Sequence, residues 1–324
     1  MIDAHPSSSN DPVLLYVAYH AVHTPLEVDE KYSAPYVALV PDRDRQVLGG
    51  MISAVDAGVS SIVQRMKIRG LWDSTLVVFT TDNGGPVCLN PSPASQHGEK
   101  IHKSCGTNNW PLRGSKMTYW QGGTRGVAFV SGPLVPAESR GTRYSGMVHQ
   151  VDWYTTLLLL AGLTPARINS TGPVPVDGVD QWAAITQGLP SPRTEVVHNI
   201  NSLGNDGAIR VGKWKLMTGH PWTGQYNAND GWWAPPEMGG GYEPSPEEQP
   251  CLAHPCLFDL ESDPYEKVDL SRNSTHAAVL EALLARFEVL RRSEVSREAA
   301  GLCTDVPDGC VANEKGGVWE PWVD

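Results

Sequence analysis

The stretch Thr75-Leu76-Val77-Val78-Phe79-Thr80-Thr81-Asp82-Asn83-Gly84-Gly85 decides the fold class of this 324-residue chain. Its apolar and β-branched run is typical of a buried strand, and Asp-Asn-Gly-Gly ends that strand in a turn. The run from Pro12 to Tyr19 has the same character. Between the two runs, apolar residues recur every three or four positions over 45–68, which predicts an amphipathic helix with one buried stripe. Strand, helix and strand joined by short connections predict a βαβ unit and therefore an α/β fold.

The remainder of the chain alternates short helical and strand patterns. We expect a strand at 127–130, a helix at 152–161, antiparallel strands at 208–211 and 214–217, an irregular stretch from 219 to 256 and a helix at 276–291. Asp152 is the expected N-cap of its helix, because a carboxylate there can accept hydrogen bonds from the first free N–H groups. The patterns divide the chain into an α/β portion, 1–195, and a smaller α+β portion, 196–324.

Charge and hydropathy exclude several classes of protein. The chain carries 25 Lys and Arg against 36 Asp and Glu, a net charge of −11, and its sequence pI is about 5.4. Nucleic-acid binding needs a concentrated basic face, so we expect no nucleic-acid partner. No apolar run approaches the roughly 18 residues that a membrane-spanning helix needs, so we expect no transmembrane segment. The first six residues lack the basic and apolar regions of a signal peptide.

Other features are those of extracellular proteins. Two triplets fit the N-glycosylation acceptor pattern: Asn169-Ser170-Thr171 and Asn273-Ser274-Thr275. The chain has six cysteines, and Cys251 with Cys256, like Cys303 with Cys310, lies in a turn-rich segment. Such spacing is typical of disulfide pairs in an oxidising compartment.

Polar residues follow the predicted strands. Asp82 and Asn83 supply hard oxygen donors, which suit Ca²⁺ or Mg²⁺, although Asn-Gly alone is a common hairpin turn. His23 follows the first strand run, so we expect it to share a crevice with Asp82 and to serve as a general acid or base, unless it is structural. Further along, Arg113, Lys116 and Arg125 lie among glycines and aromatics, which suggests an anion site or a solvated basic surface.

Taken in order, these segments resemble a known family over nearly the whole chain. The segments that carry the likeness are Val22–Leu26, Asp82–Gly85, Asn109–Lys116, Gly122–Val127, Gly212–Leu216, Leu257–Leu260 with Asp263-Pro264, and Gly317–Trp322. They resemble the type I sulfatases, most closely the branch of arylsulfatase B and its near relatives. The resemblance implies an alkaline-phosphatase-like α/β sandwich with a smaller C-terminal α+β subdomain, the N-terminal part of the main sheet being missing from this chain.

The same resemblance implies a function: Ca²⁺-dependent hydrolysis of sulfuric esters, on sulfated glycans or small aryl sulfates. His23 matches the histidine beside the sulfate ester, and Lys116 matches the lysine that holds sulfate oxygens, so both are implied in catalysis and substrate binding. Arg113 is a further substrate-binding candidate, or else a support for its loop. Asp82 and Asn83 match two ligands of the family's single Ca²⁺. A secreted or lysosomal location is also implied.

One part of the family's pattern is absent from the printed sequence. The family's nucleophile is a formylglycine made from the Cys of Cys-x-Pro-x-Arg, and none of the six cysteines stands in that motif. The family's paired N-terminal aspartates are also missing, so the calcium shell is incomplete. Residues 86–108 are longer than the family leads us to expect, and Cys88 and Cys105 flank that insertion, where a disulfide would close it.

Three hypotheses are therefore open. We favour an incomplete form of an active sulfatase, because His23, Asp82, Asn83 and Lys116 are all present. The first alternative is a pseudo-enzyme that binds sulfated glycans without turnover. The second is a phosphodiesterase of the alkaline-phosphatase superfamily, which would use a Thr or Ser nucleophile with two Zn²⁺ ions.

Overall fold

The computed structural model describes most of the chain and contains seven α-helices and ten strands in its described part. It describes residues 2–5, 12–87, 106–170, 175–201, 206–221, 230–235, 238–246 and 251–293, and the backbone of 314–315 and 318–319. The helices are α1 Glu30–Ser33, α2 Arg43–Ile68, α3 Gln121–Thr124, α4 Asp152–Leu160, α5 Pro165–Asn169, α6 Trp182–Gln187 and α7 Ala277–Arg291. The strands are β1 Val77–Thr80, β2 Ala128–Ser131, β3 Glu195–Asn201, β4 Asp206–Val211, β5 Trp214–Thr218, β6 Trp232–Ala234, β7 Gly241–Glu243, β8 Cys256–Asp259, β9 Glu314–Lys315 and β10 Val318–Trp319.

The deciding strand is present, but its partner differs from the prediction. β1 pairs antiparallel with β2, in a register that sets Val77 opposite Ser131 and Thr80 opposite Ala128. Both strands match runs that were predicted as strands. The first run is different: residues 12–20 form no strand, and Tyr16 is 88% exposed. A strand needs a hydrogen-bonded neighbour, and none of the described strands pairs with this run, so the predicted βαβ unit is wrong for the described residues.

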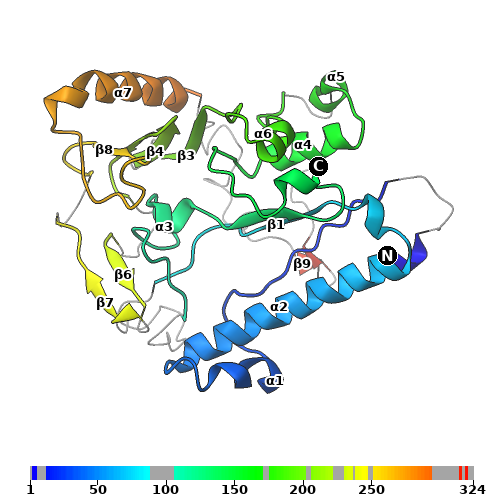
Figure 1. Ribbon diagram of the computed structural model, residues 1–324. Helices are drawn as coiled ribbons and strands as arrows, with labels where there is room; N and C mark the ends of the chain where they lie inside the picture. Colours follow the sequence, from blue (N-terminus) through cyan, green and yellow to red (C-terminus); the bar gives the residue numbers. More distant parts are fainter. Residues whose placement is uncertain are drawn as a thin grey trace.

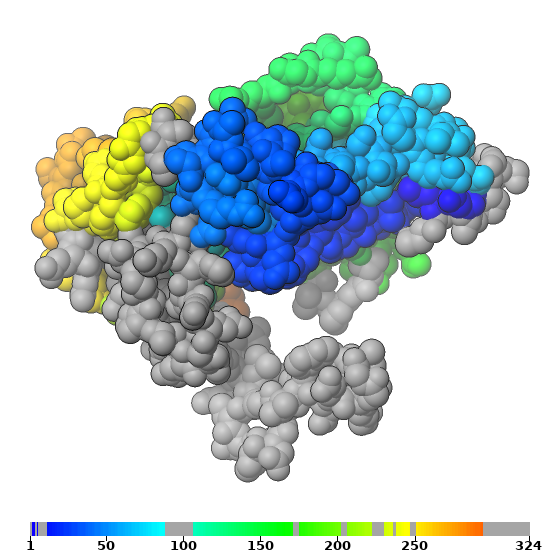
Figure 2. Space-filling model, turned by 90° about the horizontal axis from the view of Figure 1, so that it is seen from below, coloured from blue at the N-terminus to red at the C-terminus, as the bar shows by residue number. Residues whose placement is uncertain are grey.

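Helix α2 confirms the predicted helix but not the predicted burial. It starts after Asp42, whose carboxylate accepts a hydrogen bond from the Arg45 N–H at 2.9 Å. It ends at Ile68 and so covers the whole predicted range, 45–68. Met51 is buried, whereas Ile52 on the same stripe is 53% exposed. Helix α1 and the segment before it lie along one side of α2, and together they form the face of the molecule seen from below (Figure 2). The stripe is only partly covered because the described elements pack on one side of it.

The length and composition of α2 would also allow it to cross a membrane. It is the one such helix in the described residues, and 17% of its most apolar window is buried. A core helix of a soluble protein or a signal sequence passes the same test. The expectation of no transmembrane segment therefore stays a prediction.

The C-terminal sheet follows the predicted pattern. Four antiparallel strands lie in the order β3-β4-β5-β8, and α7 covers one face of them (Figure 1). The β4–β5 hairpin turns at Gly212, which has the positive φ of +55° that glycine adopts most readily. The buried residues between sheet and helix are Ile209, Leu216, Leu257, Leu283 and Phe287. The predicted strands at 208–211 and 214–217 and the predicted helix at 276–291 are thus confirmed.

The other face of this sheet packs against residues from the first half of the chain. Tyr119 and Trp120 join Ala208, Met217 and Phe258 in one buried cluster. Figure 1 shows α3, which directly follows Trp120, between the sheet and β1. The predicted division into 1–195 and 196–324 stays a prediction.

Two predictions about residues 219–256 had different outcomes. The stretch was expected to be irregular, but β6 and β7 form an antiparallel hairpin there, because Trp233 and Tyr242 pair across the strands and stack with ring centroids 4.4 Å apart. The Cys251–Cys256 disulfide is confirmed, with Cα atoms 4.9 Å apart. Cys88, Cys105, Cys303 and Cys310 lie outside the described residues.

The packing of α7 yields a test of the fold. Leu283 is 5% exposed in the α7–sheet core, and Val289 on the same helix is 55% exposed. Leu283→Ala should lower the free energy of unfolding by about 2–5 kcal/mol, because it removes buried methyl groups and leaves a cavity. Val289→Ala should change it by less than about 0.5 kcal/mol. Urea unfolding followed by circular dichroism measures both, and equal effects would contradict the assigned core.

Candidate functional site

The turn after β1 presents two oxygen donors. Asp82 is exposed and Asn83 is half-buried. The Asp82 Oδ1 atom accepts a hydrogen bond from the Asn83 N–H at 2.8 Å, and the Asn83 side-chain amide donates to the Gly84 carbonyl at 2.8 Å. These bonds fix the orientation of both side chains at the end of the strand.

A second segment, residues 113–123, packs directly onto this turn. The Lys116 N–H donates to the Gly85 carbonyl at 3.0 Å, and the Gly84 N–H donates to the Gly123 carbonyl at 3.0 Å. The Asn109 side chain reinforces the contact, because it accepts from the Gly85 N–H at 2.9 Å and donates to the Gly85 carbonyl at 2.8 Å. The structure therefore brings the predicted anion-binding lysine beside the predicted metal ligands.

This contact requires glycine. A Cβ atom at Gly84 would lie 1.7 Å from the Gly122 carbonyl oxygen, and one at Gly122 would lie 2.5 Å from the Arg113 carbonyl oxygen. Both distances are shorter than any van der Waals contact. Gly84 thus allows the turn to touch the 113–123 segment, and Gly122 allows that segment to fold closely onto itself.

Lys116 and Arg113 occupy different environments. Lys116 is half-buried at the edge of the segment, whereas Arg113 is 4% exposed. The Arg113 guanidinium donates to the Asp230 carbonyl at 2.6 Å and to the Glu266 carbonyl at 3.0 Å, and it lies 3.5 Å from the centre of the Trp120 ring. Burial lowers the pKa of Arg113 to about 10.

These contacts favour the second of the two roles predicted for Arg113, support for its loop, over substrate binding. Its guanidinium is enclosed by the chain's own carbonyls and aromatic rings, so it holds the segment rather than meeting a ligand.

Arg125, in contrast, is exposed. Burial lowers the pKa of the nearby Arg210, and the positive charge of Arg125 lowers it further.

His23 lies outside this group of contacts. It is exposed, its backbone N–H donates to the His20 carbonyl at 3.0 Å, and its ring Nδ1 atom lies 2.8 Å from the Thr24 carbonyl oxygen. Among the described residues, no hydrogen bond or ion pair joins His23 to Asp82 or Lys116. The shared crevice was inferred from two neighbouring strands, and that inference fails because residues 12–20 form no strand. The role of His23 stays a prediction.

Two further residues support the turn, Gln150 directly and Asp152 through its network, and sequence reasoning predicted neither role. The Gln150 side-chain amide donates to the Asp82 carbonyl at 2.8 Å and to the Thr81 carbonyl at 3.3 Å. Asp152 was expected to cap α4, but Val151 is the N-cap residue and Asp152 begins the helix. The Asp152 carboxylate is fully buried and pairs with Arg193 instead, at 2.8 Å from Oδ2 to Nε.

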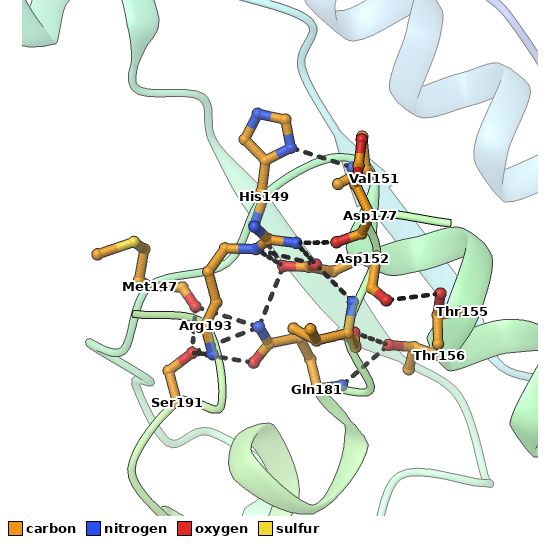
Figure 3. A network of polar contacts seen from close by, with 12 residues as sticks. Met147, His149, Val151, Asp152, Thr155, Thr156, Asp177, Gln181, Ser191 and Arg193 are labelled. Atoms are coloured by element: carbon orange, nitrogen blue, oxygen red, sulfur yellow. Dashed lines mark hydrogen bonds and ion pairs between the residues drawn. The ribbon is translucent and has the colours of Figure 1, made fainter. Parts of the chain in front are cut away.

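Figure 3 shows the network around this carboxylate, toward which the side chains of Arg193 and Gln181 point. Asp152 accepts from the His149 N–H at 2.8 Å, the Val179 N–H at 3.0 Å and the Gln181 amide at 3.1 Å, besides Arg193. The network ties α4 to the chain that follows it. It thereby fixes the His149–Gln150 corner that supports the Asp82 turn.

The donors of the turn suit a metal ion in type but not in number. A carboxylate and an amide oxygen are hard ligands of the kind that Ca²⁺ prefers, and Ca²⁺ takes about six to eight of them. Within the described residues, no group of three or more His, Cys, Asp or Glu side chains could hold a metal ion. The two side chains are therefore too few to complete the shell of such an ion, and their role as metal ligands stays a prediction.

Both predicted glycosylation sites are accessible. Asn169 and Asn273 are exposed. The Asn169 Oδ1 atom accepts from the Val176 N–H at 3.4 Å, and the Asn273 Oδ1 atom accepts from the Thr275 N–H at 3.0 Å. Glycosylation would modify the nitrogen of each amide, so neither bond blocks it.

Comparison with known proteins shows the family to which the chain belongs. Residues 3–163 match the Sulfatase family. Arylsulfatase J of Mus musculus is 32% identical over 336 residues, which cover 96% of this chain and 50% of that protein. N-acetylgalactosamine-6-sulfatase of Mus musculus is 25% identical over 271 residues, covering 81% and 45%. The chain spans about half the length of the curated relatives it matches.

Solved structures show the same fold. The crystal structure of Ps i-CgsB in complex with k-i-k-neocarrahexaose matches with a TM-score of 0.61 and 26% identity, over 88% of this chain and 51% of that one. The PsFucS1 sulfatase from Pseudoalteromonas sp. matches with a TM-score of 0.54 and 20% identity, over 84% and 47%.

The fold is thus that of the alkaline-phosphatase-like α/β hydrolases, which confirms the predicted fold class. Within that class, the chain belongs to the sulfatase family, whose members are sulfuric ester hydrolases and generally depend on a metal ion. The predicted proximity to arylsulfatase B within the family stays a prediction.

The Asp152 network yields a test by mutation. Asp152→Asn should lower the free energy of unfolding by about 3–5 kcal/mol, because it leaves the Arg193 charge, 13% exposed, without its partner. Arg286→Gln breaks the more exposed pair with Glu195 and should cost less than about 1 kcal/mol. Urea titration at neutral pH compares the two variants.

The same pair gives a pH dependence. Burial alone would raise the pKa of Asp152, but the hydrogen bonds from Arg193, Val179, His149 and Gln181 together outweigh it and lower that pKa below its ordinary 3.8. The stabilisation is therefore complete at neutral pH and is lost as the pH falls below about 4. The difference in stability between wild type and Asp152→Asn should shrink over that range. A difference that stays constant down to about pH 3 would contradict the ion pair.

Proposed function

We propose that this chain provides the sulfate- and metal-binding part of a sulfatase that hydrolyses sulfuric esters. The observation that carries the proposal is the hydrogen bond from the Lys116 N–H to the Gly85 carbonyl. It fixes a cationic residue beside Asp82 and Asn83, so that one site offers both an anion-binding group and hard oxygen donors. Family membership supports the same activity.

The proposed roles follow from the charge of the substrate. A sulfate ester is anionic, so the Lys116 ammonium offsets its charge and stabilises the charge that spreads over the oxygens in the transition state. Asp82 and Asn83 would hold Ca²⁺, which supplies further positive charge when bound. His23 would exchange a proton with the leaving group near neutral pH.

Two further parts of the proposal concern the rest of the reaction. No Cys-x-Pro-x-Arg motif occurs in the printed sequence, so we place the formylglycine nucleophile outside these 324 residues. The proposed substrates are sulfated glycans or small aryl sulfates. The i-CgsB structure, whose ligand is a neocarrahexaose, supports a glycan. The proposed location is secreted or lysosomal, which suits the Cys251–Cys256 disulfide and the two exposed sequons.

Sulfate binding tests the anion site. The chain should bind inorganic sulfate at low ionic strength in isothermal titration calorimetry. Lys116→Met should weaken this binding by about tenfold or more, because it removes a hydrogen bond to a charged group that is worth about 1.5 kcal/mol. Lys31→Met, at an exposed lysine of α1, is the matched control and should leave binding unchanged.

The same purified chain should turn over no fluorogenic aryl sulfate. Measurable hydrolysis would overturn the placement of the nucleophile, and equal sulfate binding by the Lys116→Met and wild-type proteins would overturn the anion site. Stronger binding of an aryl phosphate than of the matched aryl sulfate would favour the phosphodiesterase alternative. In the longer protein, saturable binding of a sulfated glycan without turnover would favour the pseudo-enzyme.

Calcium binding tests the metal ligands. Because two protein ligands fill only part of a calcium shell, the chain should bind Ca²⁺ with a dissociation constant of about 1 mM or weaker. Asp82→Ala should abolish this binding, and Asp73→Ala, at an exposed carboxylate in the turn before β1, should not. Titration with Ca²⁺ by calorimetry measures all three proteins. Unchanged calcium affinity in Asp82→Ala would refute the assignment.

A further inference from the structure

The segment that carries Lys116 is held from its far side by a buried ion pair. Lys215 on β5 and Glu266, after β8, are both fully buried, and the Lys215 Nζ atom lies 2.7 Å from the Glu266 Oε1 atom. Both residues lie in or near motifs of the family likeness, but the proposed function gives neither one a role. Neither side chain reaches the surface, so neither one can meet substrate.

Glu266 holds the 113–123 segment through both its carboxylate and its backbone carbonyl. Its Oε2 atom accepts from the Gln121 N–H at 2.7 Å, at the start of α3. Its backbone carbonyl accepts from the Arg113 guanidinium at 3.0 Å. Lys215 adds a further bond to the segment, because its ammonium also donates to the Tyr119 carbonyl. Glu266 and Lys215 thus fix the segment at three points, on both sides of Lys116.

The backbone of Glu266 is itself unusual. Its φ is +56°, the left-handed region that non-glycine residues seldom adopt. This conformation persists because the carboxylate and the carbonyl of one residue are both bonded to residues 113–121.

The cost of burying these charges indicates that they do more than stabilise the fold. Burial lowers the pKa of Lys215, and Glu266 opposes that effect. A buried ion pair of this kind contributes little net stability compared with apolar side chains of similar size. What it can supply is a unique position for the groups it bonds. Here those groups are the backbone of a segment whose other side contacts the Asp82–Gly85 turn.

We propose that Glu266 is a positioning residue for the anion site, acting with Lys215 through the 113–123 segment to set Lys116 against the Asp82–Gly85 turn. This inference rests on the proposed function. Glu266 touches no substrate; it fixes the backbone from which Lys116 extends. The contact between Lys116 and Gly85 therefore depends on a pair of charges in the C-terminal part of the chain.

Two double variants separate positioning from stability. Lys215→Met with Glu266→Gln keeps a side-chain oxygen that can accept from the Gln121 N–H and removes both charges. Lys215→Met with Glu266→Met also removes both charges but keeps no acceptor. Both variants avoid an unpaired buried charge, which would cost far more than either substitution. Glu243→Gln, at the exposed pair with Lys267, is the control.

Inorganic sulfate is the probe, titrated by calorimetry into the 324-residue chain well below each unfolding midpoint. The Met/Met variant should bind sulfate about tenfold more weakly than wild type, which corresponds to about 1.4 kcal/mol. The Met/Gln variant should recover most of that affinity, and Glu243→Gln should match wild type. If the ion pair only stabilised the fold, the two double variants would bind sulfate with equal affinity once both are folded.

Amide hydrogen exchange gives a readout independent of sulfate. In the Met/Met variant the amides of Gly84 and Lys116, which join the segment to the turn, should exchange about tenfold faster or more, while amides of α7 keep their protection. Equal sulfate affinity in both double variants, or unchanged exchange at Gly84 and Lys116, would overturn this inference alone. Failure of the wild-type chain to bind sulfate would overturn the proposed function and this inference together.

Discussion

The close contact between Gly84 and Gly122 is the constraint on which the site depends. The Gly122 carbonyl oxygen occupies the space where any side chain at residue 84 would begin. Because the two backbones touch, the end of β1 and the 113–123 segment form one unit, and Lys116 lies at its edge. The turn with the proposed metal ligands and the segment with the proposed anion-binding lysine are thus joined by backbone hydrogen bonds.

Buried charge supports this unit from the side opposite the turn. Lys215 and Arg113 are cations and Glu266 and Asp230 are anions, so the four formal charges cancel in the protein interior. Trp120 links them, since its indole N–H donates to the Asp230 carboxylate at 2.6 Å and its ring lies against Arg113. The C-terminal sheet therefore does more than complete a hydrophobic core. Lys215 on this sheet, with Glu266 and Asp230 from outside its strands, supplies buried charges that bond to residues 113–121.

Sequence patterns predicted the elements whose stability is local. The apolar stripe of α7 predicted its buried face, and the alternating residues of β4 and β5 predicted antiparallel strands, which the structure confirms. Both faces of these two strands are buried, which the alternation alone does not show. The run from Pro12 to Tyr19 failed because a strand is defined by its neighbour, and the apolar pattern of the run does not say whether that neighbour is present. Its failure also removed the argument from strand order that placed His23 beside Asp82, and the family resemblance alone still implies that they share a site.

The site was predicted in its residue types more than in its geometry. Asp82, Asn83 and Lys116 were named from donor chemistry and family likeness, and the structure brings them together. For Arg113 the choice between substrate binding and support for its loop stayed open, because a sequence cannot show that the guanidinium bonds to carbonyls of Asp230 and Glu266, more than a hundred residues away. Asp152 matched an N-cap pattern, but its partner Arg193 lies far along the chain and only the fold reveals the pair.

The central claim is that Lys116 and the Asp82–Gly85 turn form one anion site. Diffraction from crystals of this chain soaked in sodium selenate tests it most directly, since selenium marks a sulfate analogue by its anomalous signal. The account predicts a selenate in contact with the Lys116 ammonium and beside the Asp82 turn. Selenate bound only elsewhere on the chain, with the Lys116 ammonium directed away from it, would contradict the account.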